Sequence, residues 1–303
     1  MKPLKEYDFL KPEVFSQVEG LELRAKKIVE GLLTGVHRSP YLGSSVEFAG
    51  HREYVAGDDI KKLDWKIWGR SDKFFIKQFE EETNLVCYLV VDASRSMAYD
   101  GIMHETMSKF QYACTVAAVL LLLINRQADG VGLTVFDEQL RISLNPGNHP
   151  SHALHLIHAL STIKPSNRTD MKASLHLLAE KFLRKGVVIL ISDLFVDLED
   201  FKNALKHFRY RGHEVIVMQI MHIHELEFPF SENVQFEGME SSDAVSVDSF
   251  SVKKAYLEVV GEHNNQIKKI CASFNYDYLL ISTQDSLENV LRSYLSLRQK
   301  ARK

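Results

Sequence analysis

Residues 85–92 read LVCYLVVD, an apolar run without a break that ends on a single carboxylate. A strand with one face in water alternates polar and apolar side chains, whereas this run has no polar face. Continuous runs rich in β-branched and aliphatic residues are typical of strands that are buried on both faces of a parallel sheet. A second such run, VVILIS at residues 187–192, is followed by Asp193. These two runs predict an α/β fold.

Beyond residue 85, short apolar runs alternate with longer amphipathic segments. This alternation predicts a mostly parallel sheet flanked by helices. Gly186 and Gly212 each follow a predicted helix, and we expect both to act as C-caps. We expect further strands at residues 131–136, 140–144, 214–220 and 278–282, and helices at 105–126, 151–160, 170–184, 198–210, 252–274 and 286–298.

The first 82 residues differ in character from the rest of the chain. Residues 12–33 predict a helix, and residues 41–77 are dense in glycine, aspartate and aromatic residues without a long helical period. We therefore predict two units. Residues 1–82 form a helix plus a small β-rich element, and residues 83–303 form the α/β domain, with an inserted hairpin or loop around residues 222–252.

The charge balance and apolar content limit the classes of partner. The chain has 37 Lys and Arg residues against 40 Asp and Glu residues, a net charge of -3, so we expect no nucleic-acid partner. The longest apolar run, Tyr112–Ile124, is shorter than the roughly 20 residues that span a bilayer, so we expect no direct membrane insertion. Cys87, Cys114 and Cys271 form no CxxC pair, and we interpret them as reduced core thiols of a cytoplasmic protein.

Polar side chains follow the two doubly buried runs, where ligands bind in open parallel sheets. Asp92, Ser94 and Ser96 come directly after the first run, Asp193 follows the second, and Thr169 precedes the helix predicted at 170–184. Alternate residues of an extended segment point the same way, so the first three can act together. Carboxylates and hydroxyls are hard oxygen donors that suit Mg²⁺, or Mn²⁺. We predict a divalent-cation site made of Asp92, Ser94, Ser96, Thr169 and Asp193.

This ordered set resembles the metal-ion-dependent adhesion site of von Willebrand factor A domains, whose pattern is D-x-S-x-S, then Thr, then Asp. The resemblance implies a von Willebrand factor A-like, Rossmann-type fold. It also implies that the ion keeps an open position, which an acidic residue of a partner protein fills. The expected activity is protein binding, not enzymatic catalysis.

A longer resemblance covers most of the chain. The signature of the domain-of-unknown-function 58 family is similar to three parts of this sequence: REYVAGDD at residues 52–59, the LDW triplet at residues 63–65, and Arg70. The LEFPF segment at residues 226–230 agrees. That family is bacterial and archaeal, and its genes usually neighbour those of MoxR-type AAA+ ATPases. The resemblance implies a partner or adaptor of such an ATPase, or of its client, in a chaperone-like system.

An alternative from another class is a magnesium-dependent phosphoester hydrolase that uses Asp92 as nucleophile. Ser94 stands where the commonest motif of such phosphatases has a second Asp, and no Lys follows in an obvious supporting place. The chain also lacks the G-x-x-x-x-G-K-[ST] phosphate loop and the G-x-S-x-G elbow. The sequence therefore favours the binding module.

Two further polar groups have both a metal-binding and a structural interpretation: Asp58, Asp59 and Asp64, and His149, His152, His155 and His158. The aspartates lie close in sequence to arginines and tryptophans, which favours ion pairing within a packed element over a second cation site. The histidines recur every third residue beside a leucine-rich stripe, which favours a solvated helix side over a zinc site.

Overall fold

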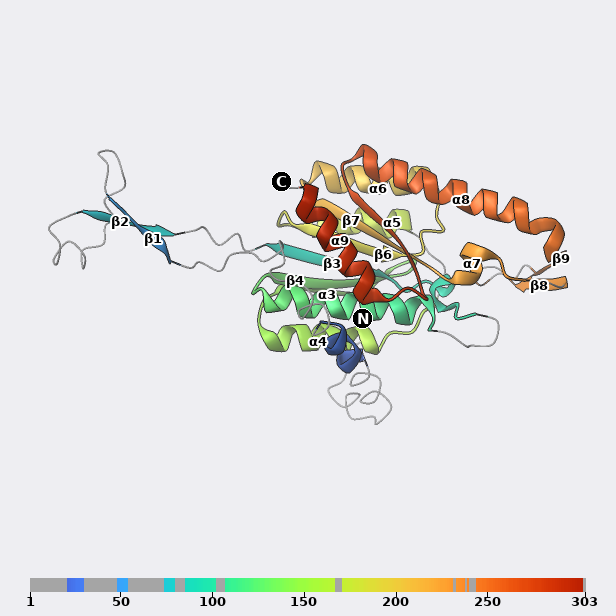
Figure 1. Cartoon of the computed structure of the whole chain (residues 1–303), viewed down its shortest axis with the longest axis horizontal. Helices are drawn as coiled ribbons and strands as arrows, with labels where there is room; N and C mark the ends of the chain where they lie inside the picture. The colour runs from blue at the N-terminus through green and yellow to red at the C-terminus, as the bar shows by residue number, and fades with distance from the viewer. Residues whose placement is uncertain are drawn as a thin grey trace.

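The computed structural model describes residues 21–29, 48–53, 74–79, 85–101, 107–166, 171–230, 233–237, 239 and 244–301. Its centre is a six-stranded sheet in the order β10-β7-β6-β3-β4-β5 (Figure 1). The strands are β3 (Val86–Asp92), β4 (Gly130–Phe136), β5 (Leu140–Gly147), β6 (Val187–Ser192), β7 (Glu214–Met221) and β10 (Asp277–Ser282). All neighbours are parallel except β4 and β5, so the predicted α/β fold with a mostly parallel sheet is confirmed.

Helices flank the sheet, as expected for a von Willebrand factor A-like fold (Figure 1). One face is covered by residues 21–29, α3, α4 and α9, and the other by α5, α6 and α8. The bounds are α3 (Lys109–Arg126), α4 (Pro150–Ser161), α5 (Met171–Lys181), α6 (Leu198–Tyr210), α8 (Ser249–Ser273) and α9 (Leu287–Ala301), with a short α7 (Ile223–Glu227) and a 3-10 turn, η3 (Arg95–Ala98). Within the described residues, no helix is both long and apolar enough to cross a bilayer.

Strand β3 shows why its sequence has no polar face. Cys87, Leu89 and Val91 pack into the core on the α3 side, whereas Tyr88 and Val90 pack into the core on the α5 and α6 side. Successive side chains of a strand point to opposite faces, and here both faces are covered. The whole strand is buried, and its last residue, Asp92, places a carboxylate at the edge of the sheet.

Helix α3 begins later than its hydrophobic pattern predicts. The expected start was residue 105, but the helix starts at Lys109 because Ser108 caps it. The Ser108 hydroxyl accepts a hydrogen bond from the Gln111 backbone N–H at 3.1 Å, and the Gln111 side chain accepts one from the Ser108 N–H at 3.2 Å. This reciprocal capping box satisfies two backbone donors and places Lys109 in the first turn.

The two predicted glycine caps had different outcomes. Gly212, which follows the C-cap residue Arg211 of α6, has a positive φ of 77°, as a helix-ending glycine should. The prediction for Gly186 is wrong, because α5 ends at Lys181 and Gly186 directly precedes β6. A Cβ atom at Gly186 would lie 2.1 Å from the carbonyl oxygen of Val86, so this glycine permits close approach of two backbones.

The described residues also include two antiparallel two-stranded sheets. Strand β1 (Phe48–Glu53) pairs with β2 (Phe75–Phe79), and β8 (Asn233–Glu237) pairs with β9 (Ala244–Asp248). The helical residues 21–29 bury Leu21, Ala25 and Val29 in the core that α3 also lines. The division at residues 82 and 83 stays a prediction. Asp58, Asp59, Asp64, Thr169 and the tryptophans lie outside the described residues.

Candidate functional site

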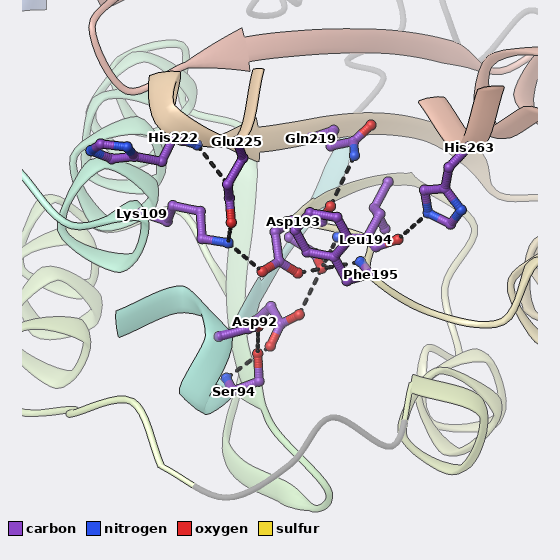
Figure 2. A network of polar contacts seen from close by, with 12 residues as sticks. Asp92, Ser94, Lys109, Asp193, Leu194, Phe195, Gln219, His222, Glu225 and His263 are labelled. Carbon is purple, nitrogen blue, oxygen red and sulfur yellow. Dashed lines mark hydrogen bonds and ion pairs between the residues drawn. The ribbon is translucent and has the colours of Figure 1, made fainter. Parts of the chain in front are cut away.

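The two predicted carboxylates reach the same edge of the sheet. Strands β3 and β6 are parallel neighbours in which Val91 lies opposite Ile191. Asp92 is the last residue of β3, and Asp193 follows β6 directly, so both side chains arrive at the carboxyl ends of adjacent strands (Figure 2). Asp92 is 0% exposed and Asp193 is 2% exposed. Two acidic groups are therefore buried close to one another.

Asp92 is grouped with both predicted serines. Its Oδ1 atom accepts a hydrogen bond from the Ser94 N–H at 2.9 Å, and Ser94 Oγ lies 3.0 Å from Ser96 Oγ. Ser94 is fully buried and Ser96 is half-buried in the η3 turn. The structure thus brings together Asp92, Ser94 and Ser96 beside Asp193. The fifth predicted ligand, Thr169, lies outside the described residues.

Ser192, the residue before Asp193, binds the Asp92 carboxylate and was not predicted. Its hydroxyl donates a hydrogen bond of 2.6 Å to Asp92 Oδ2 and accepts one of 3.0 Å from the Leu194 N–H. Leu194 has a positive φ of 58°, an uncommon conformation for a leucine. Gln219 and His263 hold this turn by binding the carbonyl oxygens of Asp193 and Leu194, each at 2.9 Å.

Burial, and to a lesser extent the nearby charge of Asp193, raises the pKa of Asp92 to about 7. The hydrogen bonds from Ser192 and Ser94 oppose this shift but do not cancel it. A buried carboxylate becomes harder to ionise when it is desolvated beside another negative charge. The ionised form of Asp92 is therefore disfavoured, mainly because the side chain is buried.

Lys109, in the first turn of α3, enters the site and was missed by the sequence analysis. Its Nζ atom donates to Asp193 Oδ2 at 2.8 Å and to Glu225 Oε1 at 2.7 Å (Figure 2). The lysine is 1% exposed, and its Nζ atom lies 5.0 Å from the centroid of the Phe195 ring. Burial by itself would lower the pKa of Lys109, but Asp193 and Glu225 outweigh it and the pKa is raised. The ammonium is a permanent charge.

Glu225, a residue of α7, also binds the ammonium group of Lys109. Its Oε1 atom accepts from Lys109, and its Oε2 atom accepts from the His222 backbone N–H at 2.8 Å, which caps α7. Burial raises the pKa of Glu225; Lys109 opposes this shift and Asp193 adds to it. His222 is fully buried, and burial, with further contributions from His224 and Lys109, lowers its pKa to about 4. Three separate elements thus meet around one ammonium group.

Two of the four histidines in and before α4, His149 and His152, make structural contacts. His149 caps the helix by accepting a hydrogen bond of 3.3 Å from the Ser151 N–H, and His152 Nε2 lies 3.0 Å from the carbonyl oxygen of Val131. Across the described ranges, no group of three or more His, Cys, Asp or Glu side chains is arranged to hold a metal ion. The predicted cation site is not such a group, because it combines only two carboxylates with serine and threonine hydroxyls.

The chain is similar over most of its length to the uncharacterized protein Mb1516 of Mycobacterium bovis. The two are 24% identical over 298 residues, which cover 96% of this chain and 92% of the relative. Among solved structures, the conserved hypothetical protein BatB from Bacteroides thetaiotaomicron has 15% identity and a TM-score of 0.45, covering 71% of this chain and 99% of BatB. The VWA domain of SpRpn10 has 11% identity and a TM-score of 0.40, covering 71% of this chain and 94% of that domain.

These TM-scores are below 0.5, and the fold assignment rests on the sheet order and flanking helices described above. The family described as "Protein of unknown function DUF58" matches residues 50–266, which is more than half of the chain. The matched region contains β3, β6 and the candidate site. The chain therefore belongs to the DUF58 family.

Proposed function

We propose that this protein is a non-enzymatic protein-interaction module whose partner binding depends on a divalent cation, Mg²⁺ or Mn²⁺. The residues that would hold the ion are Asp92, Ser94, Ser96, Thr169 and Asp193. The observation that supports the proposal most is the meeting of Asp92, Ser94 and Ser96 beside Asp193 at one edge of the sheet. The proposal rests on these site residues, since a fold by itself can host many functions.

The donor set fits such an ion. Carboxylate and hydroxyl oxygens are hard ligands of the kind that Mg²⁺ and Mn²⁺ prefer. Asp92 is fully buried beside Asp193, and burial, followed by the charge of Asp193, raises its pKa to about 7. A bound cation would stabilise the ionised form of Asp92, since buried charges are normally paired or coordinate metals. When bound, the ion would offer a Lewis-acidic position to a carboxylate oxygen of the partner.

The partner we propose is a MoxR-type AAA+ ATPase or one of its clients, in the cytoplasm. This choice follows from membership of the DUF58 family and from the acidic ligand that an adhesion site takes. Cys87, Cys114 and Cys271 are all buried and unpaired, in keeping with a reducing compartment.

The phosphoester hydrolase is the weaker candidate. Lys109 is a lysine beside Asp193, but it donates to both Asp193 and Glu225 and is 1% exposed. Both oxygens of Asp92 accept hydrogen bonds within the chain, and the side chain is fully buried. A nucleophile must come within bonding distance of the phosphorus atom, and these contacts leave Asp92 poorly placed for attack.

The test is binding of the full chain to a purified MoxR-type ATPase encoded in the same genome. We expect binding in millimolar Mg²⁺, loss of binding in excess EDTA, and loss of binding in the Asp92→Ala variant. Glu258→Ala is the matched control, because it removes an exposed carboxylate from α8, far along the chain from the site. Circular dichroism would verify that both variants fold. Equal binding with Mg²⁺ and with EDTA would remove the metal-dependent function.

A further inference from the structure

We infer that Lys109 sets the affinity of the candidate site for divalent cations, because its ammonium group competes with the ion for Asp193. The inference rests on the proposed function, in that Asp193 must be one of the cation's ligands. It assigns a role to Lys109, which is not one of the five predicted ligands.

Two ion pairs and burial hold the Lys109 side chain in place beside the candidate site. Its Nζ atom lies 2.8 Å from Asp193 Oδ2 and 2.7 Å from Glu225 Oε1, and almost none of the side chain reaches solvent. The other Asp193 oxygen has a longer contact, 3.4 Å from the Phe195 N–H. An ammonium is a compact point charge, so its hydrogen bond draws electron density from the same carboxylate that a cation would use.

The combined charge of Asp92, Asp193, Glu225 and Lys109 matches the charge of one divalent ion. When all four groups are ionised, the carboxylates of Asp92, Asp193 and Glu225 outweigh the ammonium of Lys109 by two negative charges. A divalent cation would neutralise this excess. Replacing Lys109 by a neutral residue would leave an excess of three, and replacing Glu225 by glutamine would leave one. Charges buried together interact strongly because solvent and salt screen them little.

These variants should therefore change cation affinity in opposite directions. Lys109→Met removes both the repulsion and the competing hydrogen bond, so cation binding should tighten. Glu225→Gln removes an attracting charge and leaves Lys109 free to pair with Asp193 alone, so cation binding should weaken. A purely structural ion pair would lower stability in both variants without this opposite effect on binding.

The experiment is a Mn²⁺ titration of the purified full chain, with free Mn²⁺ measured by electron paramagnetic resonance. We expect Lys109→Met to bind Mn²⁺ about tenfold more tightly than wild type, or better, and Glu225→Gln to bind several-fold more weakly. Lys254→Met, at an exposed position on α8, is the matched control and should leave the affinity unchanged. The rise in unfolding temperature on adding Mn²⁺ gives a second readout and should follow the same order.

The outcomes separate the inference from the proposed function. If wild type binds Mn²⁺ through Asp92 but Lys109→Met binds no more tightly, the inference is overturned and the metal site stands. If Lys109→Met does not fold without metal, the affinity of Glu225→Gln decides, and an unchanged or tighter value overturns the inference. If Mn²⁺ binds neither wild type nor Lys109→Met, both the inference and the metal site are wrong.

Discussion

The Nζ atom of Lys109 lies 2.8 Å from Oδ2 of Asp193, and both side chains are almost completely buried. The contact joins the first turn of α3 to the residue that follows β6, two elements 84 positions apart in the chain. One of the two predicted acidic ligands therefore carries a counter-ion from the same chain. This pair links the stability of the fold to the chemistry of the candidate site.

Removing the buried ammonium should destabilise the protein strongly when no divalent cation is present. Lys109→Ala leaves the buried carboxylates of Asp193 and Glu225 without their cation, and such a loss costs about 3–5 kcal/mol. Urea unfolding in the presence of EDTA would measure the free energy. Lys202→Ala is the control, since Lys202 forms an exposed pair with Glu199, and pairs of that kind contribute at most about 1 kcal/mol. Similar losses in the two variants would contradict this account.

The close approach of backbones at Gly186 leads to a prediction about two glycines. A Cβ atom at Gly186 meets the Val86 carbonyl oxygen at 2.1 Å, so Gly186→Ala should force β6 and β3 apart and cost about 1–3 kcal/mol. At Gly261, within α8, an added Cβ meets nothing within 4 Å, and Gly261→Ala should stabilise the helix by up to about 1 kcal/mol. Thermal unfolding of the two variants tests the contrast, and a Gly186→Ala protein as stable as wild type would refute it.

The burial of His213 predicts that the stability of the protein depends on pH. It is buried among the rings of Tyr88, Phe182 and Phe208, and burial lowers its pKa from the usual value near 6.5. The unfolded chain takes up a proton at this histidine at higher pH than the folded chain does. The stability associated with neutral His213 is therefore fully present above about pH 6.5 and is lost as the pH falls below it.

The His213→Phe variant isolates this effect. Urea unfolding at a series of pH values from about 7.5 to about 5.5 should show that the variant loses less stability than wild type as the pH falls. His155→Gln, at an exposed position on α4, should follow the wild-type curve. Parallel curves for wild type and His213→Phe would show that His213 does not titrate differently in the folded protein.

The fold could be predicted because its central strands are buried on both faces. That burial leaves a continuous apolar signature, and β6 was placed at residues 187–192, as found. Helix ends were harder, because they depend on single side chains and not on periodicity. The Ser108 cap moved the start of α3 to Lys109, and Gly186 was mistaken for a cap although its role is close packing against Val86.

The site was only partly predictable for a similar reason. Asp92, Ser94 and Ser96 belong to one local motif at a strand end, so their grouping follows from neighbouring positions. Lys109 reaches Asp193 and Glu225 over 84 and 116 positions, and no local pattern encodes such contacts. One signal was present. Lys109 is the only charged residue of α3 before Arg126, which sets it apart within an otherwise apolar helix.

We propose that a divalent cation binds at the edge of the sheet where β3 and β6 end. Crystals of the full chain grown in millimolar Mn²⁺ would reveal the ion through the anomalous scattering of the metal. We predict one anomalous peak within coordination distance of the oxygen atoms of Asp92, Ser94 and Ser96. An anomalous map with no peak at these residues would contradict the account.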